Sequence, residues 1–340
     1  MNIKDMEVAN FSCKSTFGDL ELLDVFEEYV YPAMRNQEAK GSRNSETISY
    51  KFIDLNFQKY DKELVLTGRL VKNLNLKRQQ ILEGNELITD YDSMESSPSS
   101  FFVLILSNHK LLWIRELPRA PLLKDFRYAV TKMLNLQRSE LVNDYIRRER
   151  ENIFYSSSSM TNLERRAYGL YPSLDISVTQ LGNKLAIKEK LEKFENIYSV
   201  KLKALKRNNE LASEFDALAK AMSVTQEGSG AKDVVTEIKG GKTHPLNKEY
   251  ITNIVQASAD GNYEYVVKGE DKNGTTLKET TETVSLTAKI NYVNNDVENS
   301  QNMYSKFMSL TSQIHSLPQQ QFNLFDKLNE IEKNLLNKDQ

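Results

Sequence analysis

Apolar and polar residues in the first third of the chain recur with two different periods. In the segment Leu20–Met34 the apolar positions follow helical spacing as far as Pro32, which predicts an amphipathic helix. The segments Ile48–Leu55 and Glu63–Leu70 instead alternate between apolar and polar residues, which predicts two strands. The segment Glu83–Glu95 holds five carboxylates and no lysine or arginine, so we expect a loop or lid there.

The clearest supersecondary pattern lies at Phe101–Glu116, where two apolar runs flank a polar turn, Ser107–Lys110. This arrangement predicts a β-hairpin whose first strand is buried. Pro118 and Pro121 end the hairpin, and apolar residues then return at helical spacing over Leu122–Leu136. Two strands followed by a helix indicate a compact α+β unit.

The second half of the chain repeats the order strand, helix, strand, helix. Leu174–Leu181 and Tyr198–Leu205 alternate like strands, and Lys184–Phe194 and Glu210–Met222 have helical patterns. This order predicts a small ferredoxin-like sandwich. Beyond it we expect a helix at Asn247–Ala259, a hairpin with Asn273-Gly274 at its tip, a strand at Val284–Tyr292, and helices at Asn299–Leu317 and Gln320–Leu336.

With 340 residues, the chain is longer than one hydrophobic core usually serves, so we expect two domains. The predicted fold class is α+β, in which each domain is a small, mostly antiparallel sheet packed with helices. The predicted divisions are an N-terminal α+β domain at 1–138, a charged and serine-rich linker at 139–172, a C-terminal ferredoxin-like α+β domain with a late hairpin at 173–292, and C-terminal helices at 293–340.

Composition indicates a globular protein of a reducing compartment. Sixteen tyrosines and fourteen phenylalanines supply enough apolar material to exclude a fully disordered chain. Cys13 is the only cysteine, so no intramolecular disulfide can form. The N-terminus lacks the pattern of a signal peptide, and the longest apolar run, Phe101–Leu106, falls far short of the roughly 20 residues that span a bilayer. We therefore predict a cytoplasmic protein that is not itself a membrane protein.

Residue patterns for catalysis are sparse. None of the three histidines, His109, His244 and His315, has a second His or Cys at metal-ligand spacing. The string Gly240–Thr243 resembles the end of a phosphate-binding loop, but Thr236 stands where the first glycine belongs. We therefore predict no cofactor, no metal and no catalytic residue, and favour a protein that is not an enzyme. Asp233 followed by Glu237-Ile238-Lys239 fits a metal-dependent nuclease pattern, which leaves that function as an alternative.

Charge is more informative, because it is unevenly distributed in a chain whose formal net charge is -2. Lys110–Arg138 contains seven basic residues against two acidic ones, and Lys184–Arg207 contains eight against three. Alternation places Lys201 and Lys203 on one strand face, where they could contact successive phosphates. Solvated helix and strand faces would explain the same charges equally well. The predicted phosphate-binding residues are Lys201, Lys203, Lys206 and Arg207, followed by Lys184, Lys188, Arg119 and Arg127.

Two strings give the chain a resemblance to a known family. Phe101–Phe126 (FFVLILSNHKLLWIRELPRAPLLKDF) and Tyr263–Ile290 (YEYVVKGEDKNGTTLKETTETVSLTAKI) resemble RexA-type phage-exclusion proteins and their relatives in bacterial phage-defence loci. The resemblance covers most of the chain as an order of elements and only these two strings as sequence. It implies a two-domain, DNA-binding homodimer that reports infection to an effector, often a membrane protein.

The leading hypothesis is therefore a non-catalytic phage-defence protein that binds duplex DNA with little sequence preference and signals to an effector partner. In the first alternative, the chain is an interaction subunit of a multi-component defence complex, which docks through Phe322, Phe325, Leu328 and Ile331 of its last helix. The same apolar side is more simply explained as a packing face inside the protein. The second alternative is the metal-dependent nuclease.

Overall fold

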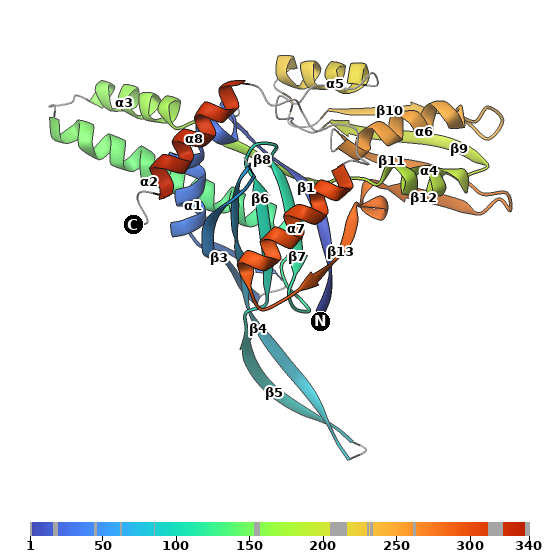
Figure 1. Cartoon of the computed structure of the whole chain (residues 1–340), viewed down its shortest axis with the longest axis horizontal. Helices are drawn as coiled ribbons and strands as arrows, with labels where there is room; N and C mark the ends of the chain where they lie inside the picture. Colours follow the sequence, from blue (N-terminus) through green and yellow to red (C-terminus); the bar gives the residue numbers. More distant parts are fainter. Residues whose placement is uncertain are drawn as a thin grey trace. The chain divides into compact units, whose positions relative to one another are not determined.

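The computed structural model describes residues 2–15, 20–43, 46–61, 63–84, 86–152, 157–204, 216–229, 231, 234–260, 263–311 and 322–336. Helices and two antiparallel sheets make up this part of the chain, which confirms the predicted α+β class with C-terminal helices (Figure 1). The chain divides into two compact units. Unit 1 comprises Met1–Ser12, Leu104–Trp113 and Ser177–Phe325, and unit 2 comprises Cys13–Val103, Ile114–Ile176 and Asp326–Gln340. Each unit thus combines stretches that are distant in sequence, whereas consecutive domains were predicted.

The larger sheet has the strand order β13-β1-β7-β6-β4-β3-β2, and β8 pairs with β1 while β5 pairs with β4. The predicted hairpin at 101–116 is present as β6 and β7, and nearly every side chain in it is buried. The strand bounds are β1 Asn2–Ser15, β2 Ala39–Arg43, β3 Glu46–Tyr60, β4 Glu63–Glu83, β5 Glu86–Ser96, β6 Ser99–Ile105, β7 Lys110–Arg115, β8 Leu174–Gln180 and β13 Thr287–Tyr292.

The acidic segment expected to be a loop or lid is strand β5 of a long hairpin in unit 2. Its turn has only two residues between Glu83 and Glu86, and Gly84 has a φ of 60°. Such a left-handed conformation suits glycine, which has no Cβ to clash with the backbone. The carboxylates of the segment do not prevent pairing with β4, because Asp92 lies opposite Arg78 and Glu95 lies opposite Asn75. Figure 1 shows this hairpin extending beyond the neighbouring strands.

In unit 2, helices pack against the strands β2 and β3. The predicted helix at 20–34 is a succession of short helices, from Leu22–Asp24 through Phe26–Val30 to α1, Tyr31–Asn36. The predicted linker at 139–172 is occupied instead by the second part of α2 (Leu123–Asn152) and by α3 (Ser157–Leu170). The core includes Phe52, Phe102 and Phe126, whose rings meet edge to face with centroids 5.5–5.7 Å apart. Helix α8, Phe322–Leu336, ends the described chain.

Unit 1 contains a separate sheet with the order β10-β9-β11-β12. Strand β8 is not part of it, so the predicted ferredoxin-like order is wrong for that strand. The amide of Leu181, just after β8, donates to the carbonyl of Val8 in β1, at an N–O distance of 2.8 Å. The elements are α4 Lys184–Glu192, β9 Asn196–Ala204, α5 Asp216–Ser229, β10 Val235–Lys239, α6 Lys248–Ala257, β11 Tyr263–Glu270, β12 Thr276–Thr280 and α7 Asp296–Thr311.

Candidate nucleic-acid interface

The two faces of the β10-β9-β11-β12 sheet differ in chemistry. Val200 and Leu202 of β9 and Val267 of β11 are buried in one hydrophobic core with Ile187 of α4 and Ile254 of α6. Because successive side chains of a strand point to opposite sides, the residues between them lie on the other face. We call that other surface the open face. Its basic residues are Lys201, Lys203, Lys239, Lys268 and Lys278, and its acidic residues are Glu237, Glu264 and Glu270.

Strand register brings three of these lysines into one line across the sheet. Lys239 lies opposite Ser199, Ser199 lies opposite Lys268, and Lys268 lies opposite Lys278. We call Lys239, Lys268 and Lys278 the lysine row. Neighbouring strands are about 4.8 Å apart, so three intervals give the row a length of roughly 14 Å. All three lysines are exposed, and neither Lys268 nor Lys278 forms an ion pair with any residue that the structure describes.

One carboxylate interrupts the basic surface. Glu237 lies opposite Lys201, with 3.6 Å between the Lys201 Nζ and a carboxylate oxygen, and its other oxygen is 3.2 Å from the Nζ of Lys239. Partial desolvation raises the pKa of Glu237, but the hydrogen bond from Lys239 and the charge of Lys201 outweigh it and hold that pKa below its ordinary value. At neutral pH the glutamate is therefore charged and offsets part of the charge of both lysines.

A second carboxylate, Glu270, lies at the end of β11. The Tyr198 hydroxyl and the Asn196 side chain hold the pKa of Glu270 below its ordinary value, with Tyr198 having the larger effect. The Asn196 amide nitrogen donates to Glu270 at 3.1 Å. This glutamate lies at the margin of the open face, where it accepts a hydrogen bond from the Asn196 side chain at the start of β9.

The structure brings only some of the predicted phosphate-binding residues together. Lys201 and Lys203 share the open face, as alternation predicted. Lys206 and Arg207 lie outside the described residues. Lys184 and Lys188 belong to α4, which packs on the buried face of the sheet. Lys184 and Lys188 therefore lie on the helix-covered side of the sheet, and the sheet separates them from the open face.

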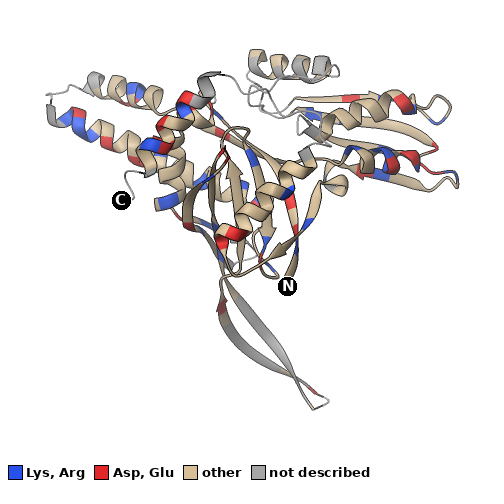
Figure 2. Cartoon of the chain, viewed as in Figure 1, with Lys and Arg blue, Asp and Glu red and all other residues tan. Residues whose placement is uncertain are grey.

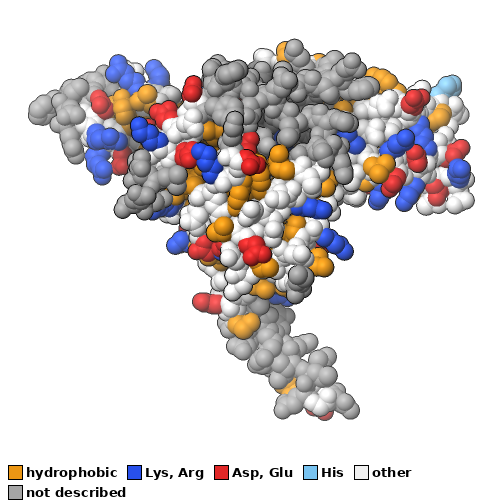
Figure 3. Space-filling view, viewed as in Figure 1, with side chains coloured by type: hydrophobic (Ala, Val, Ile, Leu, Met, Phe, Trp, Pro, Cys, Tyr) orange, Lys and Arg blue, Asp and Glu red, His pale blue; other side chains and the backbone are white. Residues whose placement is uncertain are grey.

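Helix α4 presents a mixed surface. Asn183 caps its N-terminus by accepting a hydrogen bond from the amide of Ala186 at 3.0 Å. Lys188 is exposed, and the glutamates Glu189 and Glu192 are exposed on the same helix. Figure 2 shows basic and acidic positions close together along this helix, and Figure 3 shows basic and acidic side chains intermingled in this region. The solvated helix face considered above describes α4 better than a phosphate-binding surface does.

The two predicted arginines belong to unit 2. Arg119 is exposed in the turn after β7, with a φ of 65°. Arg127 lies on α2, where its Nε donates to the carbonyl oxygen of Ile176 at 3.1 Å. Neither residue adds to the lysine row, because both belong to a different compact unit.

The lysine row was not predicted from the sequence, although the sequence contains a signal for part of it. The predicted Asn273-Gly274 turn is confirmed: Gly274 has a φ of 77°, and Lys268 pairs with Lys278 across the hairpin. Register counted outward from that turn would have placed these two lysines side by side. Lys239 could not be found in this way, because α5 lies between β9 and β10 in the chain, so no tight turn fixes the register of these two strands.

Two of the four residues predicted to dock a partner are buried in unit 2. Leu328 and Ile331 of α8 are 5% and 2% exposed, and the side chains of Phe322 and Phe325 are outside the described residues. The helix is also tied by polar contacts: Lys59 pairs with Glu332 at 2.7 Å, and Asn334 donates to Glu27 at 3.0 Å. These contacts match the interpretation as an internal packing face.

Two side chains with potential for catalysis, Glu237 and Cys13, are respectively paired with lysines and buried. Among the described residues, no three His, Cys, Asp or Glu side chains gather in a way that would hold a metal ion. Asp233 of the nuclease pattern is outside the described residues, and its partner Glu237 is held by lysines. Cys13 is buried in β1, and this burial raises the pKa of its thiol well above the ordinary value.

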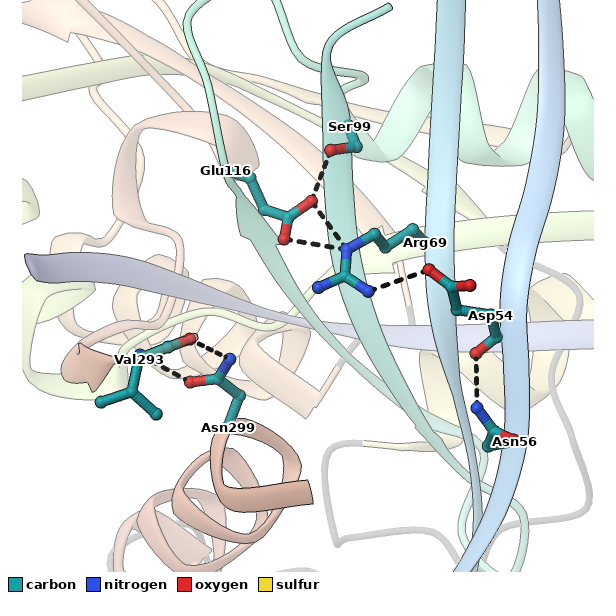
Figure 4. A network of polar contacts seen from close by, with 7 residues as sticks. All are labelled: Asp54, Asn56, Arg69, Ser99, Glu116, Val293 and Asn299. Carbon is teal, nitrogen blue, oxygen red and sulfur yellow. Dashed lines mark hydrogen bonds and ion pairs between the residues drawn. The ribbon is translucent and has the colours of Figure 1, made fainter. Parts of the chain in front are cut away.

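A polar network in unit 2 joins two carboxylates through one arginine (Figure 4). The Arg69 Nε donates to Glu116 at 3.0 Å, and its Nη1 donates to Asp54 at 3.1 Å. Ser99 also donates to Glu116. Because Arg69 stays protonated and pairs with both carboxylates, this arrangement suits a structural ion-pair network rather than acid–base chemistry.

Comparison with known proteins gives no relative from which function could be inferred. No protein-family model, no curated protein and no solved structure matches the chain. None of the described helices is both long and apolar enough to cross a membrane. The resemblance to RexA-type proteins stays a prediction. The open face is the feature of the structure that bears on function.

Proposed function

We propose that the chain is a non-catalytic, nucleic-acid-binding protein that holds the phosphate backbone of duplex DNA on the open face of its four-stranded sheet. The lysine row is the observation that carries this proposal. Three exposed ammonium groups are spread over roughly 14 Å of a rigid sheet. One strand of a duplex advances 3.4 Å per nucleotide, so a row of this length faces about four phosphates of one strand.

The chemistry of the face supports binding without sequence preference. Its basic residues are all lysines, which act as compact point charges and do not present the bidentate fork of arginine. Contacts to phosphates position a protein on the duplex but carry no sequence information. A role in phage defence with an effector partner, as the RexA-type resemblance implies, is compatible with such binding and belongs to the same proposal.

The carboxylates on the face weaken the proposal less than their number suggests. Glu237 interacts with two lysines, yet Lys201 and Lys239 have side chains 49% and 69% exposed. Ion pairs as exposed as these are weak, so a phosphate can exchange for Glu237 at small cost. Lys268 and Lys278 have no such competitor among the described residues.

The test is a binding titration of the full chain with a fluorescent 30-base-pair duplex at 50 and 200 mM NaCl. Each lysine–phosphate contact contributes about 0.9 to the slope of log K against log salt, so replacing all three row lysines by glutamine should lower the slope by about 2.7. Between the two salt concentrations, the unmodified protein should then lose roughly 40-fold more affinity than the variant.

A matched control keeps the same change in net charge. Lys193, Lys289 and Lys306 are exposed lysines of unit 1 outside the open face, and their replacement by glutamine should leave the salt slope unchanged. Absence of binding at 50 mM NaCl would overturn the proposed function. Equal slopes for the lysine-row variant and the control would remove the open face as its site.

A further inference from the structure

The helical hairpin of α2 and α3 carries an unusual concentration of arginine. Five of the fourteen arginines of the chain lie between positions 147 and 166, and no lysine lies between positions 133 and 183. Elsewhere lysine is the commoner basic residue. A surface that only needed charge for solubility could use either residue, whereas planar, bidentate recognition of phosphate needs the guanidinium fork.

The structure shows that these arginines are presented to solvent. Val142 is the last buried residue of α2 among those described, and the helix continues for two to three turns beyond it. On α3, Leu163 and Ala167 are buried. The exposed arginines are Arg147, Arg148 and Arg150 on α2 and Arg165 and Arg166 on α3. Figures 2 and 3 show basic residues on both helices, with acidic residues among them.

Two of the arginines border a groove between the helices. The groove has a volume of about 410 Å³ and is lined by Asn143, Ile146, Arg147, Arg150 and Glu164. Asn143, Arg147 and Arg150 are four and three residues apart, so they form one stripe along α2. Arg147 and Arg150 are separated by about 4.5 Å of helix rise. We call this space the arginine groove.

The carboxylates around the groove are weakly held. Asp144 accepts from Arg147 at 2.9 Å, but the two side chains are 49% and 69% exposed. Glu164, the acidic residue of the lining, is exposed as well. A surface pair of this kind contributes about 0–1 kcal/mol, so a phosphate that accepts from both arginines can displace Asp144.

We infer that the arginine groove is a second nucleic-acid contact, in which Arg147 and Arg150 clamp the phosphodiester backbone. This inference depends on the proposed function only in taking duplex DNA as the ligand, since the groove belongs to unit 2 and the lysine row to unit 1. The two sites therefore carry separate residues and can be inactivated separately.

The test uses the full chain and the same labelled duplex. Replacing Arg147 and Arg150 by glutamine should lower the salt slope by about 1.8, so the unmodified protein loses roughly tenfold more affinity than the variant between 50 and 200 mM NaCl. The matched control replaces Lys124 and Lys132, which are exposed on the first half of the same helix, and should keep the original slope.

A gain-of-affinity variant distinguishes loss of a contact from loss of folding. Replacing Asp144 by Asn and Glu164 by Gln removes the competing carboxylates and should tighten DNA binding about threefold. A misfolded protein would not produce this gain. Unchanged affinity here, together with an arginine variant that behaves like its control, would overturn the inference.

The outcomes separate the two sites. If the lysine-row variant loses affinity and the Arg147/Arg150 variant does not, the groove is excluded while the proposed function stands. If only the arginine variant loses affinity, the groove is supported and the open face is excluded. If the unmodified protein does not bind DNA at 50 mM NaCl, both proposals fail.

Discussion

The Arg69 network allows a quantitative prediction of stability. Replacing Arg69 by Ala would remove the guanidinium that pairs with Glu116, whose side chain is 13% exposed. Breaking a buried pair in this way costs about 3–5 kcal/mol, and the residual exposure of both side chains places the Glu116 contribution near 3 kcal/mol. The guanidinium also lies 5.4 Å from the centre of the Phe101 ring, a cation–π contact that contributes about 1 kcal/mol.

The second carboxylate contributes much less. The Asp54 side chain is 52% exposed, so its pair with Arg69 is worth about 0–1 kcal/mol. The expected loss for Arg69→Ala is therefore about 4 kcal/mol of the free energy of unfolding. Arg69→Lys keeps the charge but not the fork that reaches both acids, and should cost about 1–2 kcal/mol.

Urea unfolding followed by far-ultraviolet circular dichroism measures these differences, and double-mutant cycles isolate the pairs. The coupling energy between Arg69 and Glu116 should be about 2–3 kcal/mol, and that between Arg69 and Asp54 below 1 kcal/mol. A coupling to Asp54 equal to or larger than that to Glu116 would refute the reasoning, because burial would then not decide the strength of the pair.

Three further perturbations test other parts of the structure. Gly269→Ala should lower the free energy of unfolding by about 3 kcal/mol in urea titrations, because the added Cβ would lie 2.0 Å from the Asn196 carbonyl oxygen; an unchanged midpoint would contradict the predicted clash. Asn299→Ala should lower the free energy of unfolding by about 2–3 kcal/mol, because the buried amide accepts from the Val293 N–H at 2.9 Å and donates to the Val293 carbonyl at 2.8 Å (Figure 4). Asn299→Asp should recover only the hydrogen bond that the side chain accepts. Cys13 has a raised pKa and stays a protonated thiol at pH 8, so iodoacetamide should modify it only in denaturant, as mass spectrometry would show; modification of the folded protein at the denatured rate would contradict its burial.

The sequence predicted elements well wherever a local pattern determined them. The hairpin at 101–116 could be recognised because both of its strands are apolar and buried, and the turn at Asn273-Gly274 because few residues adopt its backbone conformation. The segment 139–152 lacks an apolar stripe, because this part of α2 has solvent on most sides. Its sequence therefore resembled that of a linker. Its helix is formed from residues of good intrinsic propensity, such as Leu, Arg and Glu.

Partnership between distant strands could not be predicted in the same way. Strand β8 has the alternation of any half-buried strand, and nothing in its own residues distinguishes a place beside β1 from a place beside β9. The same limit applies to the candidate site. Lys201 and Lys203 were found because they are neighbours on one strand, whereas Lys239 joins the lysine row only through the pairing of β10 with β9.

The pairing of β1 with β13 has a consequence for synthesis of the protein on the ribosome. Asn2 pairs with Tyr292, so β1 must wait until β13, the last of the described strands, has been made before this edge of the sheet is complete. At about 5–20 residues per second, the wait is roughly 15–60 s. During that time the edge of β1 exposes unpaired amide and carbonyl groups, which makes the nascent chain a candidate for chaperone binding.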